Sequence, residues 1–339
     1  TMADFFAAAG YRCGQFGKWH LGDNYPYRPH DRGFHEAVYF ASSHIGSCPD
    51  PWNNDYFDDT YWHDGVRQPF EGYTTDVFFR EAIDWIRQRA EAKQPFFAYV
   101  PLNAPHGPLF VPDRYRGPVR ERLTAALPDL PELDAATQAS LVSYLAMIEN
   151  IDENVGRLRE ALRAAGLEEN TLLIFLTDNG STFGPRYFNA GMRGSKTTIW
   201  EGGHRVPCFV RWPGGGLQHG TDVDELTQVQ DLLPTLIELC DLKRLDGPAF
   251  DGTSLAGLLK GTADRLDDRM LVVQFSRMPF QNRRPVPNAA SVPSIDGAAV
   301  LWKKWRLLDG KELYDVAADP AQERNIIADH PAGAGRMRT

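Results

Sequence analysis

Cysteine is scarce in this chain of 339 residues: Cys13, Cys48, Cys208 and Cys240 are widely spaced and form no C-x-x-C pair. A zinc ribbon or a thioredoxin-type redox site therefore has no support. No apolar run reaches the ~18 residues that a membrane-spanning helix needs. Acidic residues outnumber basic ones, which gives a formal net charge of −9, and no long Lys/Arg run is present. These absences exclude a disulfide-stapled miniprotein and a membrane channel, and they predict no nucleic-acid partner.

The chain is rich in apolar and loop-forming residues instead. Hydrophobic residues make up 42% of the sequence and aromatic residues 12%, which is enough for a large core. The 30 glycines and 24 prolines exceed average usage and indicate many shaped loops. At roughly 150 residues per domain, the length predicts two domains, or one large domain with an appendage.

Strand-like and helix-like segments alternate along the chain. Continuous apolar runs at 96–102 and 171–177 predict strands buried in a parallel sheet. Apolar residues spaced three and four apart predict helices over 75–92 and 138–165. The polar, proline-rich stretch that follows the first strand predicts no element. This order predicts an α/β fold, a mixed or mostly parallel sheet flanked by helices on both faces.

A smaller antiparallel part is expected near the C-terminus. Asp309 and Gly310 lie between two short apolar segments, and Asp-Gly suits a two-residue hairpin turn. The composition changes after about residue 266. We therefore predict an α/β domain over 1–265 and a small C-terminal antiparallel α+β subdomain over 266–339.

Polar residues follow both predicted strands, where ligands gather in open α/β sheets. Asp178 and Asn179 offer oxygen ligands that suit Ca²⁺ or Mg²⁺ rather than zinc. An ordinary Asp-Asn-Gly turn is the alternative interpretation. His106 lies between Pro105 and Pro108, so its backbone is stiff, and a rigidly held imidazole suits a general acid. A histidine of a surface loop is the alternative.

The segment GYRCGQFGKWHLG, from Gly10 to Gly22, gives the strongest local signal. Lys18 and His20 alternate with apolar residues, so in an extended segment they share one face. Together they can neutralise an anion and transfer a proton. An edge strand with its polar face in water is the alternative.

A second basic segment precedes the strand predicted at 205–211. Lys196 is the residue that we expect to bind an anion. Arg193, Glu201 and Arg205 could form a structural ion-pair network, and for Glu201 and Arg205 we favour that interpretation.

GYRCGQFGKWHLG resembles the second signature of the type I sulfatases, formylglycine-dependent arylsulfatase-like enzymes of the alkaline-phosphatase-like superfamily. APHGP, a strand ending in TDNG, RGSKTTIWEGGHRVP and a closing KELYDVAADPAQERN follow in that family's order. The resemblance spans nearly the whole chain. It implies an alkaline-phosphatase-like fold and a sulfuric ester hydrolase that acts on a carbohydrate or aryl sulfate.

The resemblance also implies roles for four basic residues. Lys18 and His20 would contact the nucleophile and the sulfate. His106 would donate a proton to the leaving alkoxide, and Lys196 would hold the sulfate oxygens and the leaving oxygen.

The resemblance further implies that Asp178 and Asn179 bind Ca²⁺, or alternatively Mg²⁺, and that a maturation enzyme makes the formylglycine nucleophile from Cys or Ser in C/S-x-P-S/A-x-R. No such motif is present, and Ser291–Ser294 imitates the serine version only as far as Ile295, which replaces the arginine. An adjacent Asp pair that completes the calcium shell in the family is also missing.

Both missing features lie upstream of the Lys18 motif in the family. We therefore expect an N-terminally truncated sulfatase that is inactive alone. The sequence itself does not show the localisation, and the resemblance implies a periplasmic or secreted full-length protein. A phosphonate or phosphate monoester hydrolase of the same superfamily, and a non-catalytic pseudoenzyme that binds sulfated glycans, are the alternatives. The aromatic residues of the loop over 25–62 could stack on sugar rings or pack locally.

Overall fold

A computed structural model describes residues 1–274 and 296–338, and the sequence Ser291–Ser294 lies outside these ranges. The chain forms two compact units. The first comprises Thr1–Thr171 and Leu236–Ala249, and the second comprises Leu172–Thr235 and Phe250–Thr339. Each unit is described by itself.

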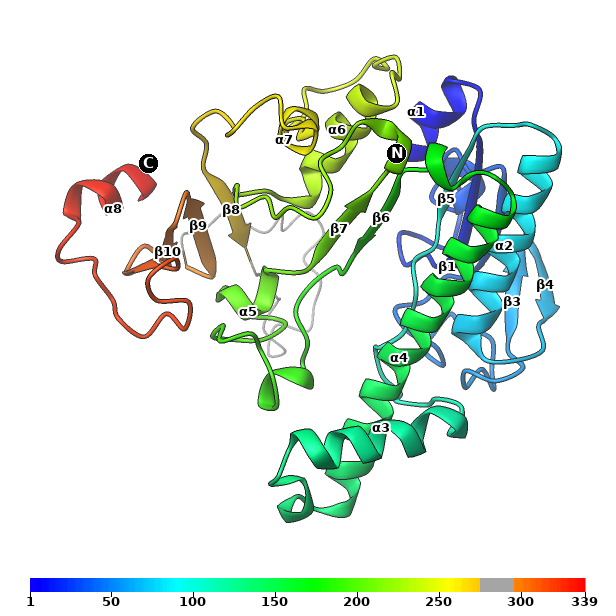
Figure 1. Ribbon diagram of the computed structural model, residues 1–339, viewed down its shortest axis with the longest axis horizontal. Coiled ribbons are helices and arrows are strands. Elements are labelled where there is room, and N and C mark those ends of the chain that lie inside the picture. Colours follow the sequence, from blue (N-terminus) through cyan, green and yellow to red (C-terminus); the bar gives the residue numbers. More distant parts are fainter. Residues whose placement is uncertain (275–295, 339) are drawn as a thin grey trace. The chain divides into compact units, whose positions relative to one another are not determined.

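The first unit is built on a five-stranded mixed sheet (Figure 1). The strands are β1 (Arg12–Lys18), β2 (Glu36–Phe40), β3 (Thr60–His63), β4 (Val66–Pro69) and β5 (Phe96–Tyr99). Their order is β4-β3-β2-β1-β5, with β1 parallel to both β2 and β5, and with β3 antiparallel to both β2 and β4. The three parallel strands thus lie side by side and end at the same edge of the sheet.

The first unit also contains helices, and the first two of them pack on the sheet. They are α1 (Met2–Ala8), α2 (Thr74–Glu91), α3 (Asp113–Ala126) and α4 (Ala135–Ala164), with 3-10 turns at Pro29–Arg32, Leu130–Glu132 and Glu168–Asn170. Cys13 of β1 contacts the carbonyl of Ala3 in α1, whereas the ring of Phe16 lies 5.6 Å from that of Trp85 in α2. Because successive strand residues point to opposite faces, α1 and α2 lie on opposite sides of the sheet. The predicted α/β architecture is confirmed.

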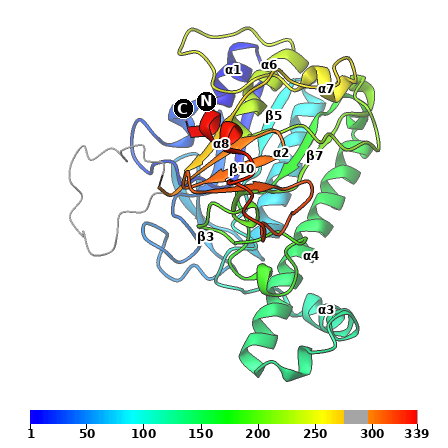
Figure 2. The same ribbon diagram turned by 90° about the vertical axis from the view of Figure 1, so that its left-hand side faces the viewer.

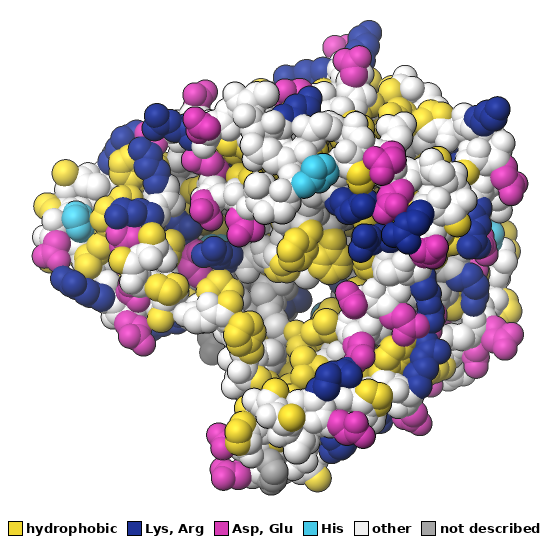
Figure 3. Space-filling view, viewed as in Figure 1, with side chains coloured by type: hydrophobic (Ala, Val, Ile, Leu, Met, Phe, Trp, Pro, Cys, Tyr) yellow, Lys and Arg dark blue, Asp and Glu magenta, His cyan; other side chains and the backbone are white. Residues whose placement is uncertain are grey.

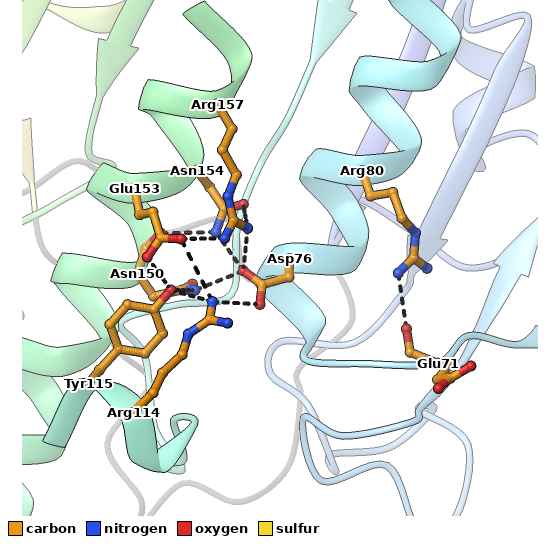
Figure 4. Close-up of polar contacts among 9 residues, drawn as sticks. All are labelled: Glu71, Asp76, Arg80, Arg114, Tyr115, Asn150, Glu153, Asn154 and Arg157. Atoms are coloured by element: carbon orange, nitrogen blue, oxygen red, sulfur yellow. Dashed lines mark hydrogen bonds and ion pairs between the residues drawn. The ribbon is translucent and has the colours of Figure 1, made fainter. Parts of the chain in front are cut away.

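A polar network joins α2, α3 and α4 (Figure 4). Asp76 accepts hydrogen bonds from the side-chain amides of Asn150, at 2.8 Å, and Asn154, at 2.7 Å. Tyr115 of α3 donates to Glu153 of α4 at 2.6 Å. Both asparagines are buried, so these bonds satisfy polar groups that would otherwise be costly to bury. The network attaches α3, a helix that the sequence pattern did not predict, to the long helix α4.

The second unit holds two antiparallel sheets. One pairs β6 (Leu173–Leu176) with β7 (Cys208–Arg211), and the other has the order β11-β10-β9-β8. The strands of the latter are β8 (Leu271–Gln274), β9 (Ala298–Trp302), β10 (Trp305–Leu308) and β11 (Glu312–Asp315). The hairpin predicted around Asp309 and Gly310 is confirmed as β10 and β11. It packs on α8 (Pro331–Arg338), as Figure 2 shows, through Leu307, Leu313 and Met337.

The remaining elements are short. They are α5 (Glu201–His204), α6 (Leu232–Leu239), which contributes residues to both units, α7 (Ala256–Lys260), and 3-10 turns at Gly184–Arg186, Pro213–Gly215 and Val229–Asp231.

The expectation for the strand at 171–177 was wrong in one respect. β6 is not part of a parallel sheet: among the described residues it pairs only with β7, which is antiparallel. Its side chains are half-buried rather than buried. A continuous apolar run indicates a strand but carries no information about the direction of its neighbour.

Two ion pairs are buried in the second unit. Glu201 accepts a hydrogen bond from Nε of Arg306 at 2.7 Å, and both side chains are buried. Asp231, which is fully buried, accepts one bond from each terminal nitrogen of Arg269, both at 2.7 Å. Removing either arginine would be costly, because it would leave a buried carboxylate without its hydrogen-bonded partner.

The surface carries mixed charge. On the face shown in Figure 3, Lys and Arg side chains are interspersed with Asp and Glu. No helix among the described residues is both long and apolar enough to cross a membrane.

Candidate active site

Basic side chains gather where the three parallel strands of the first unit end. Lys18 is the last residue of β1, and His106 lies in the loop after β5. His44, in the loop after β2, stacks on His106 with ring centroids 5.3 Å apart and an angle of 20° between the planes. The carboxyl edge of a sheet is where α/β proteins collect their functional residues.

The backbone at Lys18 is fixed by the segment after β5. The amide of Lys18 donates to the carbonyl of Pro101 at 2.7 Å. Gly17 has φ of +136°, and a Cβ there would lie 2.0 Å from the same carbonyl oxygen. The buried side chain of Gln15 donates to the carbonyls of Gly17, at 3.1 Å, and Lys18, at 3.3 Å. Glycine is required here because no side chain fits.

His20 lies outside the regular strand. β1 ends at Lys18, and His20 has φ of +46°, so the strand alternation that was expected to put the two on one face does not continue to His20. The two residues are nevertheless close. Burial, and then the positive charge of Lys18, lower the pKa of His20. The neutral form of His20 is therefore favoured.

His106 is held through its backbone and one ring nitrogen. Tyr56, which is fully buried, donates its hydroxyl hydrogen to the carbonyl of His106 at 2.8 Å and accepts a hydrogen bond from Asn103. Burial raises the pKa of Tyr56 far above its usual value, so this donor keeps its hydrogen. Nδ1 of His106 lies 2.8 Å from the carbonyl of Gly107, which can only accept, so Nδ1 is protonated. Nε2 of this exposed side chain is left to take up or release a proton.

His44 is a member of this cluster that the sequence analysis missed. Its pKa is lowered by burial and then by His106, Lys18 and His20. No motif marks it. The signal that could have found it is its position shortly after β2, a strand that the sequence pattern did not separate from the surrounding loops.

The second unit brings together the other predicted site residues. Asp178 and Asn179 follow β6 after one intervening residue, Thr177. The amide of Lys196 donates to the carbonyl of Ser181 at 3.2 Å, so the Lys196 loop is joined to the loop that carries the Asp-Asn pair. Lys196 is half-buried, and within the described ranges its ammonium forms no ion pair. Lys196 is thus available to bind an anion.

Close backbone packing positions the Asp-Asn loop. The amide of Gly180 donates to the carbonyl of Gly203 at 3.0 Å. A Cβ on Gly180 would lie 1.9 Å from the carbonyl oxygen of Gly202. Two backbone segments therefore approach more closely at Gly180 than any other residue would permit.

The donor set in this loop fits a hard cation only in part. Asp178 and Asn179 supply oxygen ligands of the kind that Ca²⁺ and Mg²⁺ prefer. The described residues include no group of three or more His, Cys, Asp or Glu that could hold a metal. Since Ca²⁺ takes about 6–8 oxygens, these two residues would form only part of its shell.

Glu201 and Arg205 are structural, as expected. Glu201 is buried against Arg306, and Nη1 of Arg205 lies 3.7 Å from Glu201. Arg193 does not join this pair: its guanidinium lies 3.7 Å from the ring centroid of Trp200.

Comparison with known proteins identifies the family. The sulfatase family model matches residues 1–242. This chain belongs to the sulfatase family. A second model, for the C-terminal region of N-sulphoglucosamine sulphohydrolase, matches residues 194–334. The resemblance to the type I sulfatases is confirmed.

Individual sulfatases match most of the chain. An arylsulfatase of Klebsiella aerogenes is 30% identical in an alignment of 316 positions that covers 71% of this chain and 68% of that protein. An ulvan-active sulfatase of Formosa agariphila is 28% identical in an alignment of 336 positions that covers 96% of this chain and 61% of that protein. The crystal structure of Ps i-CgsB in complex with k-i-k-neocarrahexaose shares the fold, with a TM-score of 0.80 at 23% identity over 99% of this chain and 72% of that one. This sulfatase chain thus spans about three fifths to three quarters of these three proteins.

Proposed function

We propose that this chain provides substrate-binding and proton-transferring residues of a sulfuric ester hydrolase. The observation that carries the proposal is the convergence of Lys18, His20 and His106 at adjacent strand ends, in a chain of the sulfatase family. A sulfate ester resists hydrolysis because its anionic oxygens repel a nucleophile and because an alkoxide leaves poorly. Preorganised cations reduce the repulsion between the sulfate oxygens and the nucleophile, and an acid protonates the leaving oxygen.

The residues of the first unit divide these tasks. The Lys18 ammonium offsets the negative charge of the sulfate oxygens, which would otherwise repel the nucleophile. His106 transfers the proton of Nε2 to the leaving oxygen, while its Nδ1 stays bonded to the carbonyl of Gly107. His20, with its lowered pKa, contacts the sulfate and the nucleophile.

The residues of the second unit supply further charge. Lys196 binds the sulfate oxygens and the leaving oxygen. Asp178 and Asn179 provide part of the shell of a Ca²⁺ or Mg²⁺ ion, which when bound would neutralise charge on the sulfate. The formylglycine nucleophile has no precursor motif in residues 1–339, and we propose that it lies upstream, made by a maturation enzyme from Cys or Ser.

A sulfated carbohydrate is the substrate class that we favour. One relative is named as ulvan-active, and Ps i-CgsB was solved with a neocarrahexaose. The aromatic loop offers side chains of two kinds. Tyr56 and Tyr61 are fully buried and belong to the core, whereas Trp52 is 93% exposed and Tyr25 is 76% exposed. Tyr27 and Phe57 are also exposed, so the exposed aromatic residues, and not the buried ones, are available to stack on a sugar ring.

Two measurements test this function. The coding sequence upstream of Thr1 is read for a C/S-x-P-S/A-x-R motif, whose absence would favour the glycan-binding pseudoenzyme. The protein that includes this chain and the nucleophile is then assayed side by side on 4-nitrophenyl sulfate and an aryl phosphonate ester. We expect a higher kcat/KM on the sulfate, and a higher value on the phosphonate would assign the alternative hydrolase.

A further inference from the structure

His44 is the member of this basic cluster whose ring stacks on that of His106. We propose that His44 binds substrate by accepting, at Nε2, a hydrogen bond from a hydroxyl group of the leaving alcohol close to the ester oxygen. The proposal rests on the proposed function and deepens it, because it names a residue that selects sulfated alcohols bearing such a hydroxyl.

The hydrogen-bond network behind His44 defines the tautomer of its ring. Ser47 Oγ donates its only hydrogen to the carbonyl of His44, at 2.8 Å. The contact of 3.1 Å between Ser43 Oγ and Ser47 Oγ therefore needs the hydrogen of Ser43. Ser43 then has no hydrogen left for Nδ1 of His44, which lies 3.0 Å from it, so Nδ1 must be the donor. In the neutral ring, the lone pair is on Nε2.

Nε2 of His44 is available for a ligand. Within the ranges that the structure describes, no protein group forms a hydrogen bond with it, and the half-buried side chain is not sealed from solvent. Burial and the nearby charges of His106, Lys18 and His20 lower the pKa of His44, which agrees with a neutral ring. An unpaired acceptor in a partly desolvated place gains from a donor that a ligand brings.

An acceptor complements the remaining groups of the cluster. Lys18 is a donor only, and His106 in its acid form donates from Nε2. These groups suit sulfate oxygens and a leaving oxygen, all of which accept. A free hydroxyl on the leaving alcohol is a donor, and His44 is stacked on His106, the residue that protonates that alcohol. His44 is therefore placed to bind the hydroxyl of a sugar rather than its sulfate.

The test compares two substrates in three variants. The protein that includes this chain and the nucleophile is given a monosulfated methyl glycoside with a free hydroxyl next to the ester, and the matching deoxy glycoside. His44→Phe keeps a flat ring for stacking but removes the acceptor, whereas His44→Gln restores an acceptor. His30→Gln changes an exposed histidine that pairs with Asp64 in the same unit and serves as the control.

We expect the wild-type protein and the control to prefer the hydroxylated glycoside by about 10-fold in kcat/KM. His44→Phe should remove this preference, mainly through KM, and His44→Gln should regain part of it. Circular dichroism checks that His44→Phe is folded. If the folded variant still prefers the hydroxylated glycoside, the proposal is overturned. If the wild-type protein hydrolyses neither sulfate, the proposed function itself fails. If it hydrolyses both with no preference, only the role of His44 fails.

Discussion

The amide of Lys18 donates a 2.7 Å hydrogen bond to the carbonyl of Pro101, which joins the end of β1 to the segment that leads to His106. This contact fixes the backbone of Lys18 against the segment after β5, and Gly17 makes the contact sterically possible. The geometry of the basic cluster therefore depends on Gly17, which has no functional side chain.

Gly17→Ala should lower the free energy of unfolding by roughly 2 kcal/mol or more, because the new Cβ meets a backbone oxygen and the φ angle is unfavourable. Urea unfolding measures the change. Gly65→Ala is the matched control, since Gly65 also has a positive φ, of +84°, but open space around it. Equal losses in the two variants would show that the approach to Pro101 is not tight.

Lys18→Ala and Lys196→Ala should each reduce kcat/KM for 4-nitrophenyl sulfate by about 10-fold to 100-fold, because each removes a charge-assisted contact to an anion. The assay uses the protein that includes this chain and the nucleophile. Lys243→Ala removes an exposed lysine and should leave the rate unchanged. An unchanged kcat/KM in the Lys18 or Lys196 variant would show that the lysine does not take part in the reaction.

Arg306→Met should destabilise the second unit by about 3–5 kcal/mol, since it leaves the Glu201 carboxylate buried without its partner. The double variant Glu201→Gln with Arg306→Met should recover part of this loss, because no buried charge remains. Thermal unfolding of the three variants gives the comparison. A single variant as stable as the wild type would show that water reaches Glu201.

The spacing of apolar residues predicted the helices that have a clear apolar stripe. Helix α4 has a long apolar stripe, and its last residues precede Gly166, which has a positive φ. Helix α3 was missed because Pro118 lies inside it and few of its residues are apolar. The partner of Glu201 was missed for another reason: Arg306 is 105 positions away, and only the folded sheet brings the two together.

The residues of the candidate site that lie in sequence motifs could be predicted from the sequence. Lys18, His106 and Lys196 lie in segments whose sequence resembles family signatures. His44 does not, and its role depends on strand order: β2 lies next to β1 in the sheet, which places the loop after β2 beside the Lys18 motif. Strand order cannot be read from periodicity.

Asp231 should make stability depend on pH in the acid range. Burial alone would raise its pKa, but the hydrogen bonds from Arg269 and from two backbone amides outweigh burial, so the pKa is lowered in the folded state. Its contribution is therefore complete above the unfolded pKa of about 3.9 and is lost as the pH falls through the lower, folded value. Unfolding free energies of the wild type should fall more steeply below pH 4 than those of Asp231→Asn. Parallel curves would contradict this.

The chain of residues 1–339 alone should not hydrolyse an aryl sulfate. We propose that Lys18, His20, His106 and Lys196 bind the ester and its leaving group, but no residue in the sequence lies in the motif from which formylglycine is made. Purified chain and 4-nitrophenyl sulfate, followed by nitrophenol absorbance, give the measurement, with Lys196→Ala as the control for contaminating activity. Turnover that this substitution abolishes would mean that another side chain in the chain attacks sulfur.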